Sequence, residues 1–170
     1  GTMLQAYKLD EAAYRGALTK AGVTIHDTRA VIEDAHTVRL ATGESFRVKH
    51  ILIATGGRPY VPEVPGGATL LTSNDIFKFD ALPKSVLIVG GGFIACEFAC
   101  ILTGLGVAVT QVYRGAQILR GFDEEARGHV AELMREQGVD LHCGTDIIGM
   151  RPAAGGTWVK TTDGREAVYG

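Results

Sequence analysis

Hydrophobic residues follow three successive patterns along the chain: a helical repeat, then short β-type runs, then strands alternating with helices. Residues 9–22 carry apolar side chains at the spacing of an amphipathic helix, and Gly22 fits a C-terminal cap. Five short runs rich in β-branched residues follow, at residues 23–27, 30–34, 37–41, 45–49 and 51–55. Polar turns separate these runs, so the pattern predicts a helix followed by a β-meander.

A segment rich in proline and glycine separates this region from the rest of the chain. Residues 56–67 hold three of the five prolines together with four glycines, which predicts a crossover without regular structure. Residues 72–83 then predict a short helix capped by Ser73 or Asn74 that ends before Pro83. We therefore expect one segment over residues 1–60, a linker and short helix over 61–83, and a second domain over 84–170.

From Lys84 onwards, short strands alternate with helices. The predicted strands are residues 85–89, 107–113 and 139–144, and the predicted helices follow Gly92 and cover residues 123–138. A stripe in the first helix (Ile94, Phe98, Ile101 and Leu105) is expected to face the core. This order predicts an α/β fold, a Rossmann-like βαβ parallel sheet.

The C-terminal residues predict antiparallel hairpins, with turns at residues 155–156 and 163–164. We therefore expect a meander or hairpin addition to the parallel sheet. Because the sequence stops on a strand, we also expect the second domain to be truncated at its C-terminal end.

The turn between the first strand and helix of this domain carries the pattern Gly90-x-Gly92-x-x-Ala95. In dinucleotide-binding βαβ units, the first glycine permits a tight turn and the second lets the backbone approach a pyrophosphate. The third position is small so that the helix can lie on the strand, and the helix N-terminus attracts phosphate. The context of strand, motif, helix and strand predicts nucleotide binding, with Gly91 as the free position between the two motif glycines.

The end of the second strand indicates which nucleotide is bound. An NAD site places an acid there to bind the ribose 2′-hydroxyl, but this chain has Tyr113, followed by Arg114 and later by Arg120. Two guanidinium groups can hold a 2′-phosphate through charge-assisted bonds, so we expect NADP(H). The alternative is that both arginines are solvated surface residues. The domain would then be a non-catalytic βαβ interaction module whose glycines only turn the chain.

The helix after the glycines contains two further candidate features. Glu97 is the one charged residue in its first two turns, and it either complements the helix dipole or shares a face with Phe93 near the nicotinamide. Cys96 and Cys100 are four residues apart, and we interpret them as small buried helix residues rather than as a redox or metal pair.

Composition narrows the possible classes of function. The chain is 46% hydrophobic and 21% charged with a net charge of −2, which favours a globular protein and gives no electrostatic case for nucleic acid or anionic lipid. No apolar run reaches bilayer length. Three cysteines do not form a disulfide framework, so we expect a cytoplasmic protein.

Four stretches of the sequence together resemble the pyridine nucleotide–disulfide oxidoreductase family, and within it the glutathione reductases. They are ILIATGGRPYVPEVPG, LTSNDIF, LPKSVLIVGGGFIACEFACIL and VYRGAQILRGFDEEAR. The last stretch discriminates best, since lipoamide dehydrogenases carry an acid at the Tyr113 position. It is similar in trypanothione reductases, which tend to share the phenylalanine at 93. The resemblance covers most of residues 20–142.

The resemblance implies roles for residues on both sides of the linker. Arg114 and Arg120 would hold the 2′-phosphate, while Gly91 and Ile94 would line the dinucleotide. Phe93 would cover the nicotinamide pocket.

The same resemblance extends to the flavin. Glu97 would lie beside the nicotinamide, paired with a lysine of the flavin domain. Ala30, Thr55 and Gly56 match positions that approach FAD in an intact enzyme. In such an enzyme NADPH reduces FAD, FAD reduces a protein disulfide, and the resulting thiols reduce glutathione disulfide.

Several parts of that enzyme are missing from these 170 residues: the C-x4-C redox pair, the first flavin-binding βαβ unit and the dimerisation domain. We therefore expect the NADPH-binding domain of a larger flavoprotein, preceded by a strip of its FAD domain in residues 1–60. Such a fragment is expected to be inactive and to bind FAD weakly or not at all. It can be a monomer, although its parent would be a homodimer. The parent's disulfide substrate stays open, with trypanothione and mercuric reductases as alternatives.

Overall fold

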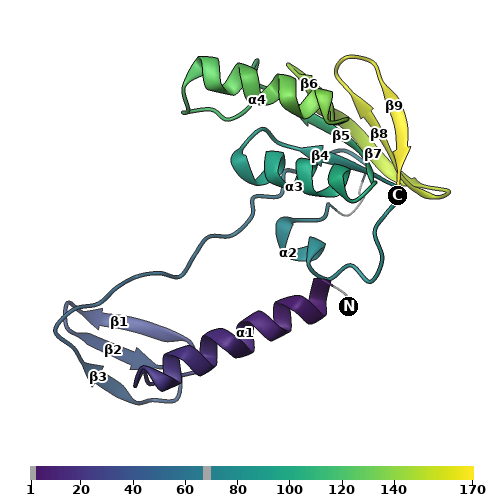
Figure 1. The fold of residues 1–170 in the computed structure, drawn as a ribbon. Coiled ribbons are helices and arrows are strands. Elements are labelled where there is room, and N and C mark those ends of the chain that lie inside the picture. Colours follow the sequence, from purple (N-terminus) through teal and green to yellow (C-terminus); the bar gives the residue numbers. More distant parts are fainter. Residues whose placement is uncertain (1–2, 67–69) are drawn as a thin grey trace. The chain divides into compact units, whose positions relative to one another are not determined.

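The computed structural model describes residues 3–66 and 70–170, which form two compact units, Met3–Pro59 and Tyr60–Gly170 (Figure 1). Gly67, the last residue of the predicted linker, lies outside the described residues.

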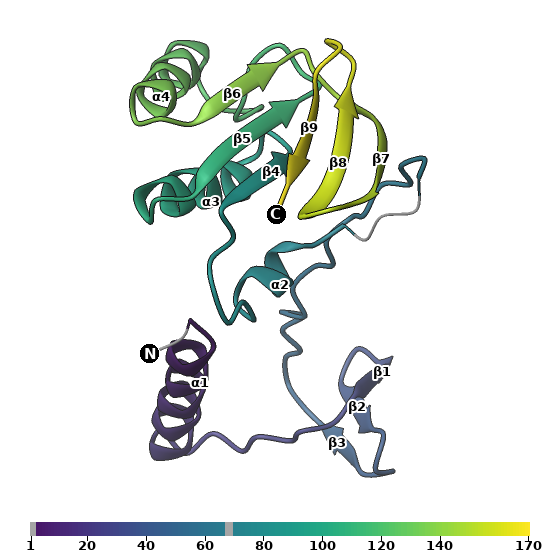
Figure 2. The same ribbon diagram turned by 90° about the vertical axis from the view of Figure 1, so that its right-hand side faces the viewer.

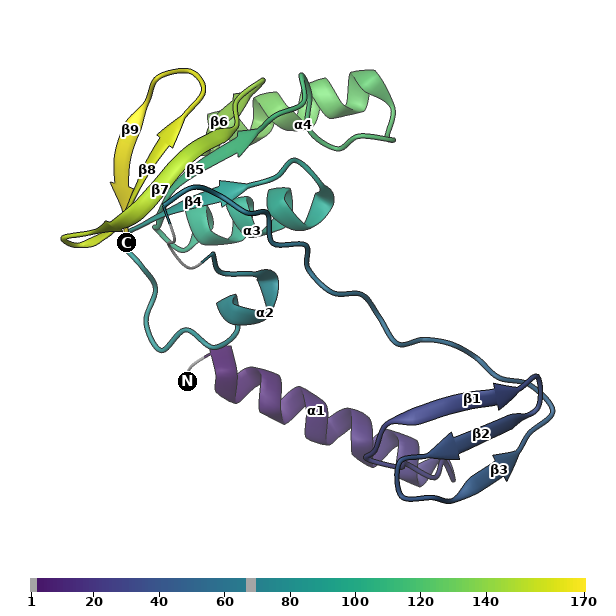
Figure 3. The same cartoon turned by 180° about the vertical axis from the view of Figure 1, so that it is seen from behind.

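The first unit contains one helix and one small antiparallel sheet (Figure 3). Helix α1 covers Met3–Lys20, and Gly22 adopts a φ of +80° just after it, which confirms the predicted glycine cap. The strands are β1 (Ala30–Asp34), β2 (Thr37–Leu40) and β3 (Ser45–Arg47), in the order β1-β2-β3. The predicted meander is therefore present with three strands.

Two of the five predicted strands, residues 23–27 and 51–55, are not strands in the structure. A strand is defined by its pairing with a neighbour, and neither stretch pairs with another strand among the described residues. Both retain the composition of a strand, and Leu52 and Ile53 remain largely exposed. The prediction was wrong because a hydrophobic run reports local preference and not the presence of a partner.

In the second unit, a short helix, α2 (Ser73–Ile76), is capped by Thr72, not by Ser73 or Asn74 as predicted. The Thr72 side chain accepts a hydrogen bond from the Asn74 backbone N–H (3.3 Å). In return, the Asp75 carboxylate accepts one from the Thr72 backbone N–H (2.9 Å). This reciprocal capping box selects Thr72, and the helix ends well before Pro83.

The centre of the second unit is a parallel sheet with the order β4-β5-β6 (Figure 2). It consists of β4 (Ser85–Val89), β5 (Ala108–Tyr113) and β6 (Asp140–Cys143), connected by α3 (Phe93–Gly104) and α4 (Glu124–Glu136). Both helices cover one face of the sheet (Figure 2). This arrangement confirms the predicted βαβ organisation.

The C-terminal residues form the predicted antiparallel addition, with the order β7-β8-β9. These strands are β7 (Ile147–Ala153), β8 (Gly156–Thr161) and β9 (Glu166–Tyr169). Gly155 and Gly164 take left-handed φ angles of +84° and +86° at the two turns. The Gly170 carbonyl accepts hydrogen bonds from the backbone N–H groups of Lys84 and Ser85 (both 3.2 Å), which ties this sheet to the start of β4.

The core lies between the parallel sheet and the two helices, but α3 presents a different face to it than predicted. Its buried residues are Cys96, Ala99 and Leu102. The predicted stripe is on the other side: Ile94, Ile101 and Leu105 are exposed and Phe98 is half-buried. Because α3 is apolar on nearly all sides, hydrophobicity alone does not identify its inner face.

The glycine turn before α3 is packed against the end of β5. Gly91 is buried, and a Cβ atom built there would lie 2.4 Å from Cγ of Tyr113. The Tyr113 ring also excludes a side chain at Gly115, where a Cβ would lie 2.5 Å from its Cε1 atom. The interpretation of Gly91 as a free position is therefore wrong, because only hydrogen fits between this backbone and the ring.

This packing predicts different effects at two adjacent glycines. We expect Gly91→Ala to lower the free energy of unfolding by about 1–3 kcal/mol, because the new methyl group must displace the Tyr113 ring. We expect Gly92→Ala to change it by less than about 1 kcal/mol, since Gly92 has a φ of −79° and open space at its Cβ position. Urea denaturation of both variants measures the difference, and equal losses would contradict the packing.

Candidate functional site

The parallel pairing of β4 with β5 brings two loops together at the carboxyl end of the sheet. Val89 pairs with Val112, and the Gly90 N–H donates to the Val112 carbonyl (2.9 Å). The loop after β4 holds residues 90–92, and the loop after β5 carries Arg114 and Arg120. In open α/β sheets, ligands bind outside the carboxyl ends of the strands, so these loops define the candidate site.

Each glycine of residues 90–92 meets a different requirement. Gly90 has a φ of +142°, a conformation that side chains oppose, and its Cβ position faces the Ala95 methyl group at 3.6 Å. At Gly91, the Tyr113 ring leaves no space for a side chain. Gly92 is the N-cap of α3, makes no side-chain capping bond and opens to empty space. The backbone at Gly92 is thus accessible to a ligand at the helix N-terminus.

A buried glutamine that was not predicted from the sequence forms a hydrogen bond to the backbone of the glycine turn. Gln111 is fully buried, and its Nε2 atom donates to the Gly90 carbonyl (2.9 Å) and to Cys96 Sγ (3.6 Å). Its Oε1 atom is buried without a hydrogen-bond partner among the described residues. The sequence did contain a signal that could have identified Gln111, because a long polar side chain lies within the mostly apolar strand VAVTQVY.

The two arginines extend from the neighbouring loop into solvent. Arg114 and Arg120 are both exposed, and in the described part of the chain neither guanidinium has a hydrogen-bonded or ion-paired partner. Between them, Leu119 has a φ of +56°, and its backbone N–H donates to the Gly91 carbonyl (2.5 Å). The arginine loop is therefore joined to the glycine turn by a direct main-chain bond.

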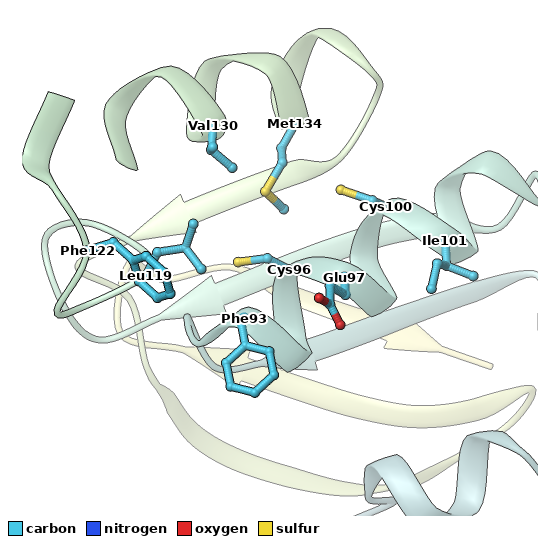
Figure 4. A pocket seen from close by; sticks show the side chains of 9 residues that line it. All are labelled: Phe93, Cys96, Glu97, Cys100, Ile101, Leu119, Phe122, Val130 and Met134. Atoms are coloured by element: carbon cyan, nitrogen blue, oxygen red, sulfur yellow. The ribbon is translucent and has the colours of Figure 1, made fainter. Parts of the chain in front are cut away.

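An apolar groove of about 650 Å³ adjoins the two loops (Figure 4). Its lining comes from α3, α4 and the loop between β5 and α4: Phe93, Cys96, Glu97, Cys100, Ile101, Leu119, Phe122, Val130 and Met134. Glu97 is the one charged side chain among these, and it extends from the same side of α3 as Phe93 (Figure 4). The spacing argument for a shared face is consistent with this placement.

The remaining predicted residues lie in the first unit. Ala30 begins β1 and pairs with Leu40, while Thr55 and Gly56 lie in irregular, exposed chain. Gly56 has a φ of +67°, a left-handed backbone conformation that favours glycine.

The two cysteines of α3 differ in environment. Cys96 is buried, as predicted, but Cys100 is exposed at the groove, so the prediction was wrong for Cys100. Burial raises the pKa of the Cys96 thiol, and the hydrogen bond from Gln111 only partly opposes this shift. Within residues 3–66 and 70–170, no group of three His, Cys, Asp or Glu side chains is placed to hold a metal ion, and no helix is long and apolar enough to cross a membrane.

These environments predict selective thiol chemistry. At neutral pH, iodoacetamide should modify Cys100 at least about tenfold faster than Cys96, because the thiolate is the reactive form and burial both lowers the thiolate fraction of Cys96 and shields its sulfur. Peptide mass spectrometry over a time course measures both rates in the folded protein, and Cys100→Ser serves as the control for peptide assignment. Equal rates would show that α3 does not pack as described.

Comparison with known proteins places the chain in a family. It matches the family described as pyridine nucleotide-disulphide oxidoreductase over residues 5–169. It is 42% identical over 154 residues to a glutathione reductase of Burkholderia cepacia, covering 91% of this chain and 34% of that protein. It is 35% identical over 160 residues to a trypanothione reductase of Leishmania donovani, covering 87% of this chain and 33% of that protein.

The fold is also similar to a solved structure, the Cu(II) complex of the HOCl-induced flavoprotein disulfide reductase RclA from Escherichia coli. The TM-score is 0.77 at 20% identity, covering 98% of this chain and 40% of that chain. The 170 residues span about a third of the length of the two reductases named above. Since the family match includes nearly every residue, the chain belongs to the pyridine nucleotide–disulphide oxidoreductase family.

Proposed function

We propose that residues 84–170 bind NADP(H), with the pyrophosphate at Gly90–Gly92 and the 2′-phosphate between Arg114 and Arg120. The observation that carries this proposal is that two anion-binding features lie on loops joined by a hydrogen bond. The N-terminus of α3, which has no side-chain cap, attracts a pyrophosphate. Two guanidinium groups without a partner among the described residues extend from a loop bonded to the same turn.

The preference for the phosphorylated cofactor follows from charge. A carboxylate at the end of β5 would bind a ribose 2′-hydroxyl and repel a 2′-phosphate, but the residue there is Tyr113. Its half-buried ring packs against Gly91, so it shapes the turn that receives the cofactor. Arg114 and Arg120 supply positive charge where the acid is missing.

The nicotinamide end of the cofactor is assigned to the start of α3. Phe93 is 57% exposed and free to cover a nicotinamide ring, and Ile94 is exposed beside it. Glu97 follows one turn later on the groove and would lie alongside the ring. The cofactor supplies a hydride when bound, and these side chains orient the ring and exclude water from it.

We assign residues 1–60 to part of an FAD-binding domain and residues 61–83 to the connection between the domains. Ala30, Thr55 and Gly56 are proposed to approach the flavin in the whole protein. We propose that the whole protein is a cytoplasmic homodimer. The likeness to the Burkholderia cepacia reductase favours reduction of glutathione disulfide as its reaction. The likeness to a trypanothione reductase keeps a related disulfide as the alternative.

The 170 residues by themselves are proposed to bind NADPH, to retain little or no FAD and to complete no turnover. Their three cysteines include no C-x4-C pair, and Cys96 is packed in the core of α3. A flavin-dependent disulfide reductase needs such a pair to accept electrons, so this step requires residues beyond those present here.

Removing the two arginines should abolish the preference for NADPH. For Arg114→Ala/Arg120→Ala, we expect NADPH binding to weaken by about 3 kcal/mol, or roughly 100-fold, because charge-assisted bonds to the 2′-phosphate are lost. NADH binding should change less than about threefold. Isothermal titration calorimetry measures both affinities, with Arg135→Ala on the exposed end of α4 as the matched control.

The same titration separates the two classes of function. Preferential NADPH binding by the wild-type protein supports the cofactor assignment. Equal and negligible binding of both cofactors would favour the alternative, in which the βαβ unit is an interaction module and its glycines only turn the chain.

A further inference from the structure

Arg120 itself is exposed, but the backbone just before it is held by buried side chains and hydrogen bonds. Ile118 is fully buried in the core between the sheet and the helices. Leu119 is half-buried against the same core, and its N–H is bonded to Gly91. Gln117 is attached to α4 through its Nε2 atom, which donates to the Glu124 carbonyl (2.9 Å).

Arg127, in the second turn of α4, completes this support. Its Nε atom donates to the Ile118 carbonyl (2.7 Å) and its Nη2 atom donates to the Gln117 carbonyl (2.9 Å). Both bonds are partly buried, and the described residues include no carboxylate paired with this guanidinium. The planar donor fork of arginine thus binds two consecutive main-chain carbonyls, an arrangement that a lysine cannot reproduce.

Leu119 shows that this support imposes a specific conformation. It is the one non-glycine residue in the described ranges with a positive φ, a conformation that costs about 1 kcal/mol or more for a side chain of this kind. The bond to Gly91, the packing of its side chain and the fixed carbonyls before it maintain this conformation. The direction of the chain as it enters Arg120 is therefore determined by the surrounding structure.

We propose that Arg127 and Leu119 are positioning residues for recognition of the 2′-phosphate: they fix the backbone from which Arg120 extends. This inference rests on the proposed binding of NADP(H) and adds two residues that do not touch the cofactor. A charged side chain on a fixed backbone loses less conformational entropy on binding than one on a mobile loop. Arg127 and Leu119 thereby raise the affinity for ligands that carry a 2′-phosphate, and not for nucleotides in general.

The test compares two soluble probes, 2′,5′-ADP and 5′-AMP, titrated calorimetrically into the whole 170-residue chain. We expect Arg127→Met to weaken 2′,5′-ADP about five- to tenfold and 5′-AMP less than about twofold, since only the former uses Arg120. Arg127→Lys should restore part of the loss, because a single ammonium can reach one carbonyl. Arg135→Met, on the same helix, should leave both affinities unchanged.

Leu119→Gly provides a second variant in case Arg127→Met fails to fold. Glycine keeps the backbone N–H that binds Gly91 and accepts the positive φ without strain, but it frees the loop to take other conformations. The same selective loss of 2′,5′-ADP affinity is expected.

The outcomes distinguish the two levels of the proposal. A wild-type protein that does not prefer 2′,5′-ADP overturns the proposed NADP(H) site itself. A wild-type preference that survives both Arg127→Met and Leu119→Gly overturns the positioning inference alone. Equal weakening of both probes also overturns it, because a general structural role would produce that result.

Discussion

The carbonyl group of Gly91 determines the geometry of the candidate site, because it links the two loops that would bind a dinucleotide. It accepts a hydrogen bond from the Leu119 N–H (2.5 Å), while the ring of Tyr113 lies too close to the Gly91 backbone to allow any side chain there. The turn proposed to face a pyrophosphate and the loop that carries Arg120 are consequently joined by a direct main-chain hydrogen bond. Displacing Gly91 would alter both at once.

Electrostatics then explains why this unit would favour a ligand with two separate phosphate groups. The N-terminus of α3 presents the positive end of a helix dipole with no acidic residue in its first turn to neutralise it. Arg114 and Arg120 add positive charge on the same edge of the sheet, and the groove beside Phe93 offers apolar surface for a ring. These features match the proposed NADP(H) ligand, and membership of the pyridine nucleotide–disulphide oxidoreductase family agrees with the use of a pyridine nucleotide.

Local patterns in the sequence predicted the elements whose causes are local. The tight turn at Gly90 with the small Ala95 facing it, the glycine cap at Gly22 and the turns at Gly155 and Gly164 were confirmed, because each depends on backbone conformation within a few residues. Features that depend on distant partners were missed. Residues 23–27 and 51–55 pair with no strand among the described residues. The inner face of α3 is set by the sheet, and the positive φ of Leu119 is maintained by Gly91 and Arg127.

The most direct measurement is an amide NMR titration of the isotopically labelled chain with NADP⁺ and, in parallel, with NAD⁺. Both ligands should shift the amides of residues 90–95, since both carry a pyrophosphate. NADP⁺ alone should produce large shifts at Arg114, Leu119 and Arg120, because only its 2′-phosphate reaches that loop. Shifts of the same size at these three amides with both cofactors, or none at residues 90–95 with either, would contradict the account.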